Sequence, residues 1–256
     1  MKMQKLMALI QVELKKLVRE PMSLAVLMLM PVGLTLILFF ALGNVANAND
    51  FYPVPGMSHF DYLMPGIMGY SIIYMGMIVA LALVEYRQAG LLERLEITPV
   101  STSIYLWSQI IANIFIALLQ GLIVILLAWV LGFEPLGGVS GMLLAFLFLC
   151  VLAISAVGFG LITAAVSKDS GAAGGLSMIF ILPMMMFGSL LTVFNETTRS
   201  IAKFTPNFYV SDSLSMIFHE GKVSDPAIWM NLLTLTIYSL VIVGAGIQLF
   251  KRIKHH

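Results

Sequence analysis

The chain has 256 residues, of which 60% are hydrophobic and only 11% are charged, and its mean hydropathy is +0.98. Soluble globular proteins carry about 25% charged residues, so this chain lacks the polar groups needed to cover a water-facing surface. Its 14 basic and 13 acidic residues leave a net charge of +1, which does not favour a partner such as nucleic acid or an acidic substrate. The composition therefore indicates that the protein lies in a lipid bilayer.

The first 20 residues have the pattern of an amphipathic helix at the membrane surface. Their apolar residues recur close to the helical i, i+3, i+4, i+7 spacing, and most of the lysines lie elsewhere on the helix. Such a helix lies flat in the interface, with its lysines near anionic lipid headgroups. The apolar positions are Leu6, Leu9, Ile10, Leu14, Leu17 and Val18. A basic leader that only sets the orientation of the chain is the alternative.

Six uncharged, mostly apolar stretches follow. A helix rises about 1.5 Å per residue and the hydrocarbon core is about 30 Å thick, so one crossing needs roughly 20 residues. The predicted spans are residues 22–43, 62–84, 103–131, 136–166, 171–194 and 226–250. None of them contains Asp, Glu, Lys, Arg or His. The sequence thus predicts an all-α, polytopic membrane protein with six spans in a single transmembrane domain, residues 1–256.

The basic residues between the spans predict the orientation, because short loops rich in Lys and Arg stay on the cytoplasmic side. With both termini inside, the cytoplasmic segments hold 11 of the 14 basic residues. These are Lys2, Lys5, Lys15, Lys16, Arg19, Arg87, Arg94, Lys168, Lys251, Arg252 and Lys254. We therefore expect a multi-pass protein of the cell membrane, of the prokaryotic cytoplasmic type, with both termini in the cytoplasm.

The densest cluster of charges lies between the second and third spans, in residues 85–101. Leu91, Leu92 and Leu95 share one side of a short predicted helix, which Pro99 ends because proline lacks a backbone donor. A helix this short is not stable alone in water, so we expect it to pack against another surface. A solvated loop is the alternative.

This cluster resembles a segment of the membrane-spanning permease subunits of type-2 ATP-binding-cassette (ABC) exporters. Their second cytoplasmic segment reads Glu, a basic residue, Gly, then Leu-Glu-Arg-Leu, a short spacer and Thr-Pro-Val-Ser. The matching positions here are Glu85, Arg87, Gly90, Leu92, Glu93, Arg94, Leu95, Thr98, Pro99, Val100 and Ser101. The layout of the whole chain is also similar, although strong local similarity is confined to residues 85–101.

The resemblance implies a coupling helix that fits a cleft on a separate ABC ATPase subunit. It further implies two ATPase subunits and a second permease subunit, and we favour a homodimer. No cofactor is expected in this chain, because ATP and magnesium belong to the partner ATPase. No catalytic residue, metal site or nucleic-acid partner is expected either.

The predicted outer segment, residues 195–225, is too polar to cross the membrane. Its apolar residues Val210, Leu214, Ile217 and Phe218 follow i, i+4, i+7, i+8 spacing, and Gly221 offers a helix stop. One or two short helices that dip into the outer leaflet fit this pattern, and the similar family has such re-entrant elements. Its outer asparagine-proline motif is also present in part, with the order reversed at Pro206-Asn207. A soluble outer loop is the alternative.

The source of energy is indicated by two absences in the sequence. Ion-driven transporters usually carry ionisable residues inside their spans, and none is found in these six. The chain also has no G-x-x-x-x-G-K-[ST] phosphate loop, so it does not hydrolyse ATP itself. An intramembrane enzyme and a channel are the alternatives. The predicted spans lack the histidine base that a serine enzyme needs, and their polar residues form no filter-like run.

In the similar family, cargo moves between two permease subunits, largely along the second and fifth spans. The matching lining residues would be Tyr70, Tyr74, Met75, Phe180, Met184 and Phe187. Methionine and aromatic side chains suit hydrophobic or amphipathic cargo of irregular shape, such as drug-like molecules, lipids or glycolipids. Pro183 should bend the fifth span near its middle. The same residues would also pack well against lipid or other helices.

Overall fold

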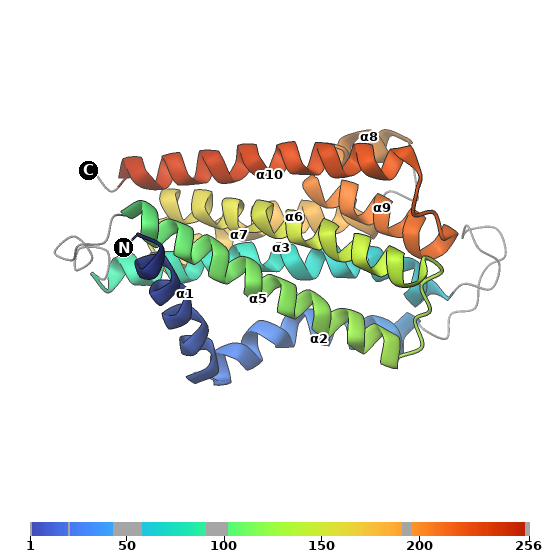
Figure 1. Ribbon diagram of the computed structural model, residues 1–256, viewed down its shortest axis with the longest axis horizontal. Helices are drawn as coiled ribbons and strands as arrows, with labels where there is room; N and C mark the ends of the chain where they lie inside the picture. Colours follow the sequence, from blue (N-terminus) through green and yellow to red (C-terminus); the bar gives the residue numbers. More distant parts are fainter. Residues whose placement is uncertain (1, 20, 43–57, 91–101, 191–195, 254–256) are drawn as a thin grey trace.

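The computed structural model describes residues 2–19, 21–42, 58–90, 102–190 and 196–253, and these residues form helices without any strand. The helices form an elongated bundle in which α1 begins and α10 ends near the same end, here called the terminal end (Figure 1). In chain order they are α1 (Lys2–Arg19), α2 (Pro21–Leu42), α3 (His59–Gln88), α5 (Thr102–Val130), α6 (Gly138–Val166), α7 (Ser170–Met185), a π-helical turn η1 (Met186–Leu190), α8 (Glu196–Ala202), α9 (Pro206–Glu220) and α10 (Pro226–Ile253). The opposite end, which carries α8 and α9, is the α9 end (Figure 1).

Five of the described helices are long and apolar enough to cross a membrane. Their apolar spans are His59–Gln88, Ile104–Val130, Gly138–Val166, Ser170–Gly188 and Pro226–Phe250. The sequence predicts one more span at residues 22–43, where the structure has α2. Among the described residues of α2, the apolar stretch Leu27–Ala41 is shorter than the other five.

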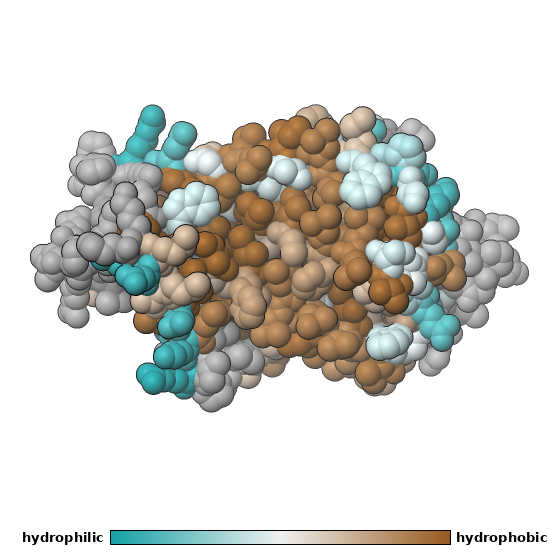
Figure 2. Space-filling model, viewed as in Figure 1, coloured by the Kyte–Doolittle hydropathy of each residue, from teal (hydrophilic) through white to brown (hydrophobic). Residues whose placement is uncertain are grey.

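The surface of the bundle matches a membrane environment. Figure 2 shows a broad apolar band around the middle of the visible face, with hydrophilic residues gathered toward the two ends. Large apolar side chains on α5 and α10 are exposed, among them Phe115, Leu126 and Leu240. An exposed apolar surface of this extent is stable in lipid and costly in water. The protein is therefore an all-α, multi-pass membrane protein.

α1 runs across the bundle and packs against α5 (Figure 1). The side chains of Leu6, Leu9, Ile10 and Leu14 are half-buried, whereas Lys15 and Lys16 on the other face are exposed. This is the two-sided helix that the apolar spacing predicts. The acidic residue Glu13 lies on the half-buried face among the apolar residues. This is an unusual place for a carboxylate, and its contacts are described below.

Close contact between backbones holds α3, α6 and α10 together. A Cβ atom at Gly76 on α3 would lie 2.7 Å from the backbone oxygen of Ala156 on α6. On the other side of α6, a Cβ atom at Gly158 would lie 2.8 Å from the backbone nitrogen of Val243 on α10. Such approaches are characteristic of helix pairs in membranes, where association depends on close packing. α6 thus lies between α3 and α10 and packs tightly against both.

α7 changes its helical form close to its only proline. Pro183 lacks a backbone donor, which removes one hydrogen bond of the α-helix. The π-helical turn η1 begins at Met186, three residues later, and π-helical turns often mark such interruptions. The helix type therefore changes three residues after Pro183, the residue at which a bend of the fifth span is predicted.

Two helices form in the predicted outer segment, α8 and α9. In α9 the side chains of Val210, Leu214, Ile217 and Phe218 are all buried, as their shared face predicts. Gly221 ends the helix with φ of 65°, a left-handed conformation that glycine adopts without strain. The apolar face of α9 packs on α3, α6 and α10, so this segment is part of the bundle and not a loop in solvent.

Candidate functional site

The last turn of α3 contacts three other helices through three consecutive residues. The first is Tyr86, whose hydroxyl donates a hydrogen bond to Glu13 Oε2 on α1 at 3.2 Å and accepts one from Lys16 Nζ at 3.1 Å. The Lys16 ammonium also lies 4.7 Å from the centre of the Tyr86 ring, within range of a cation–π interaction. Glu13 Oε1 accepts a further hydrogen bond of 2.6 Å from the buried Gln109 on α5. One carboxylate thus connects α1 to both α3 and α5.

The second residue is Arg87, which caps the end of α6. Its Nη1 atom donates to the backbone oxygen of Ala164 at 3.2 Å, and its Nη2 atom donates to the backbone oxygen of Ser167. The last carbonyls of a helix have no partner inside the helix, and they form the negative end of its dipole. The guanidinium group of Arg87 donates hydrogen bonds to these carbonyls, and its positive charge is favourable at the negative end of the dipole. Arg87 therefore fixes the end of α3 to the end of α6.

The third residue is Gln88, whose Oε1 accepts a hydrogen bond of 3.5 Å from Ser170 Oγ at the start of α7. Gly90 follows with φ of 66°, and its N–H bonds to the Arg87 carbonyl at 3.0 Å. This left-handed glycine ends the helix, which explains why the segment needs glycine at this position. Tyr86, Arg87 and Gln88 are together called the α3 junction. It holds α1, α6 and α7 at the residues that precede 91–101.

A small apolar pocket lies between α3, α6 and α7. Its lining residues are Ile73, Gly76, Met77, Phe159, Thr163, Ser177, Phe180, Ile181 and Met184. The rings of Phe159 and Phe180 lie 5.3 Å apart and form one wall. The hydroxyl of Ser177 is buried and has no hydrogen-bond partner. The pocket therefore offers an apolar lining and one unpaired hydroxyl group.

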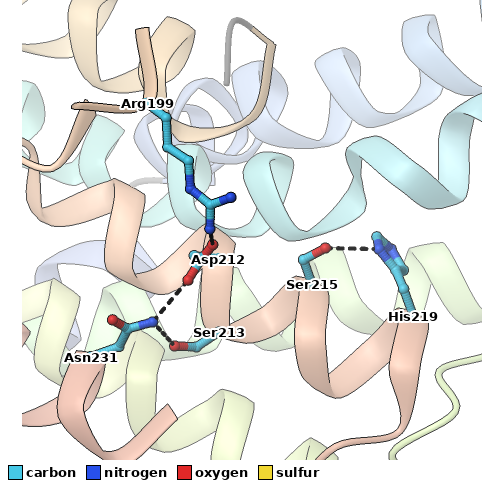
Figure 3. Close-up of polar contacts among 6 residues, drawn as sticks. All are labelled: Arg199, Asp212, Ser213, Ser215, His219 and Asn231. Atoms are coloured by element: carbon cyan, nitrogen blue, oxygen red, sulfur yellow. Dashed lines mark hydrogen bonds and ion pairs between the residues drawn. The ribbon is translucent and has the colours of Figure 1, made fainter. Parts of the chain in front are cut away.

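Polar contacts at the α9 end hold α9 against its neighbours (Figure 3). Arg199 on α8 forms an ion pair of 3.1 Å with Asp212 on α9. The side-chain amide of Asn231 on α10 donates to Asp212 Oδ2 at 3.0 Å and to Ser213 Oγ at 3.1 Å. The network thus joins α8, α9 and α10. His219, at the other end of α9, is bonded to Ser215 in the same view.

Comparison with protein families identifies the chain. The family model described as "ABC-2 type transporter" matches residues 4–219. The chain belongs to the ABC-2 type transporter family. No curated protein matches it. The protein is therefore the permease subunit of an ABC transporter, and its family implies association with an ABC ATPase subunit.

Three of the predicted coupling residues of this ABC-2 permease lie in the described part of the chain. Glu85 is exposed, Arg87 is bonded to α6, and Gly90 ends α3. The remaining predicted coupling residues lie outside the described part of the chain: Leu92, Glu93, Arg94, Leu95, Thr98 and Pro99.

Two of the six predicted path residues line the pocket, and the other four do not. Phe180 and Met184 lie together in the pocket. Tyr70, Tyr74 and Met75 are buried inside the subunit, and Phe187 is half-buried on η1. Within the described residues, no group of three or more His, Cys, Asp or Glu side chains could hold a metal ion.

Sequence reasoning missed the contact between Glu13 and Gln109 of the permease. The position of Glu13 among the apolar positions of an amphipathic helix could have indicated its role, because a buried carboxylate requires a partner. Gln109 is a polar residue inside an apolar span, which also suggests a partner. Nothing in the sequence indicated that Glu13 and Gln109 bind each other, because they are 96 residues apart.

His219 is a buried histidine whose two ring nitrogens both lie within hydrogen-bond distance of a partner. Its Nδ1 lies 2.9 Å from Ser215 Oγ and its Nε2 lies 3.0 Å from the backbone oxygen of Asp61, an arrangement that suits a neutral ring with the proton on Nε2. Burial lowers the pKa of His219 below its ordinary value of 6.5, and the carbonyl and the charges of Asp61 and Glu220 oppose this only in part.

We therefore expect the melting temperature to fall as the pH is lowered through 6.5. The unfolded chain takes up a proton on His219 below about pH 6.5, whereas the folded chain resists it, so this contribution is complete above that pH and lost below it. His219→Gln should show a smaller fall between pH 7.5 and 5.5 in thermal unfolding of the purified protein. An unchanged pH profile in this variant would contradict the assignment.

Proposed function

We propose that this permease exports a hydrophobic or amphipathic molecule, drug-like, lipid or glycolipid in nature, with energy from a separate ATPase. Two permease subunits, favoured to be identical, pair in the cell membrane, and two ATPase subunits bind beneath them. ATP and magnesium are held in those ATPases. The terminal end faces the cytoplasm and the α9 end faces outward, in agreement with the distribution of basic residues.

The α3 junction is the observation that carries the proposal. A segment that receives a push from a docked ATPase must be attached to the helices that it moves. Residues 91–101 begin three residues after Gln88. The junction residues Tyr86, Arg87 and Gln88 contact α1, α6 and α7. Closure of the ATPases on ATP would displace residues 91–101, and the junction would pass that displacement to several helices at once.

The cargo class rests on the pocket between α3, α6 and α7. Its lining is formed mostly by aliphatic, methionine and phenylalanine side chains, with the hydroxyl residues Thr163 and Ser177 as the polar exceptions. Flexible thioethers such as that of Met184 can repack around cargo of irregular shape. No ionised side chain lines it, so the pocket favours apolar parts of a molecule over charged ones.

The test of the proposed docking segment reverses its charges. We expect Glu93→Arg combined with Arg94→Glu to abolish co-purification of a co-expressed ABC ATPase, because the two charges would then face groups of like sign. Glu220→Lys combined with Lys222→Glu is the matched control, because these residues form an ion pair of 2.6 Å at the α9 end that reversal preserves. Stable ATPase binding by the first variant would count against docking at residues 91–101.

A further inference from the structure

Asn207 is a buried side chain that joins α9 to the point where α7 becomes η1. It is the second residue of α9 and is fully buried. Its Nδ2 atom donates a hydrogen bond of 2.9 Å to the backbone oxygen of Met184. Its Oδ1 atom is buried and has no hydrogen-bond partner. The amide is therefore paired on one side only.

Two glycines from different helices make room for this amide. A Cβ atom at Gly69 on α3 would overlap Asn207 Oδ1, and one at Gly188 on η1 would overlap Asn207 Nδ2. Both neighbours are therefore restricted to glycine as long as the amide stays in place. The side chain of Asn207 fills a notch formed by α3 on one side and η1 on the other.

The notch is adjacent to the pocket between α3, α6 and α7. Met184 takes part in both, because its carbonyl holds Asn207 and the residue also lines the pocket. Gly69 lies four residues, or one helical turn, before the lining residue Ile73 on α3. The amide thus lies between α3 and η1 beside the pocket, on the side toward α9.

The pairing on one side only makes this contact easy to reverse. A buried acceptor without a partner is unfavourable, and exposure to water would satisfy it. Opening the notch would break the bond to Met184 but hydrate both the freed carbonyl and Asn207 Oδ1. The favourable hydrogen bond to Met184 offsets the unfavourable burial of Asn207 Oδ1, so the free energy of opening this contact is small. A buried amide with all its hydrogen bonds made would resist opening.

We propose that Asn207 is a positioning residue that acts as a latch. Its contact with η1 closes the pocket between α3, α6 and α7 toward the α9 end, and this contact must open during the transport cycle. This inference rests on the proposed function for its link to ATP, but the latch itself belongs to the permease alone. The two parts can therefore be tested separately.

The first experiment traps the latch with a disulfide in the permease alone. A Cβ atom at Gly188 would lie 3.7 Å from Asn207 Cβ, which is within the range of disulfides. Asn207→Cys also removes the amide that would otherwise collide with a side chain at position 188. We expect Asn207→Cys with Gly188→Cys, in a Cys150→Ala background, to cross-link in most molecules on oxidation. Asn207→Cys with Gly175→Cys is the control, because Gly175 on α7 has no neighbour within 4 Å.

A second measurement on the permease alone tests whether the amide holds η1 in place. In Gly69→Ala, residue 207 is still asparagine, but the new methyl group on α3 occupies the notch and displaces the amide. We expect it to raise hydrogen exchange of the η1 amides at least tenfold, whereas Gly175→Ala should leave them as in the wild type. Failure of the disulfide to form, or unchanged exchange in Gly69→Ala, would overturn the latch.

The final arm uses the complex with a co-expressed ABC ATPase. We expect the cross-linked complex to turn over magnesium-ATP at least tenfold more slowly, and a reductant such as dithiothreitol to restore the rate. Unchanged ATP turnover after complete cross-linking would show that the contact between α9 and η1 stays closed throughout the cycle, and would contradict the proposal that it must open. If no ATPase binds the wild-type permease, the proposed function fails, and the disulfide and exchange results still decide whether the latch exists.

Discussion

Gly158→Val is expected to lower the melting temperature of the purified permease by about 2–12 °C. The Cβ atom of a new side chain would lie 2.8 Å from the backbone nitrogen of Val243 and 2.9 Å from its Cα atom. These are backbone atoms that cannot rotate away, so α10 would have to move. Overpacking of this kind costs about 1–3 kcal/mol, and each kcal/mol lowers the melting temperature of a chain of this size by about 2–4 °C.

The effect should be specific to the contact between α6 and α10. Gly244→Val is the matched control, because Gly244 lies on α10 beside Val243 and has no neighbour within 4 Å. Melting temperatures in detergent, followed by size-exclusion chromatography after heating, would compare the two variants. Equal shifts would mean that valine itself, and not the close approach of the helices, is responsible.

Arg87→Met is expected to reduce ATP turnover by the transporter complex at least about tenfold while the ATPase stays bound. Methionine keeps much of the length of the side chain but donates no hydrogen bond to Ala164 or Ser167. Hydrogen bonds from a charged donor contribute about 1.5–3 kcal/mol each, so loss of both should detach the end of α3 from α6. Residues 91–101, the proposed coupling segment, would then move without moving α6.

Two further variants separate this effect from a general loss of positive charge. Lys168→Met removes an exposed charge next to Ser167 and should leave turnover unchanged. Arg87→Lys should be intermediate, because an ammonium group lacks the fork that reaches two carbonyls. Pull-down of the ATPase followed by turnover of the recovered complex gives both quantities. Loss of ATPase binding in Arg87→Met would assign Arg87 to the docking surface instead.

The long helices are the part of the fold that sequence reasoning predicted well. The third and fourth predicted spans, residues 103–131 and 136–166, differ from α5 and α6 by no more than two residues at either end. Uncharged stretches of this length have few alternatives in a membrane, because every backbone group must be bonded internally. The second predicted span was less accurate, since α3 continues to Gln88 beyond its limit at residue 84.

The contacts of the candidate site were much less predictable. A helix that is apolar on all sides carries no polar face to indicate which side meets a neighbour. Glycine is also permitted in a membrane helix for several reasons, so Gly69 and Gly188 gave no sign of a notch. The pairing of Arg87 with Ala164 spans 77 residues, and the pairing of Asn207 with Met184 joins α9 to α7.

The sequence by itself determined that the chain lies in a membrane, where its apolar stretches fall, and which face of α9 is buried. Each of these follows from local composition or from a periodicity of 3.6 residues, which a single segment carries in full. Only the tertiary structure decided that Arg87 caps α6, that Glu13 joins α1 to α3 and α5, and that Asn207 lies between Gly69 and Gly188. These contacts depend on how each helix is rotated and placed against its neighbours, and that arrangement is set by side-chain packing across the whole bundle.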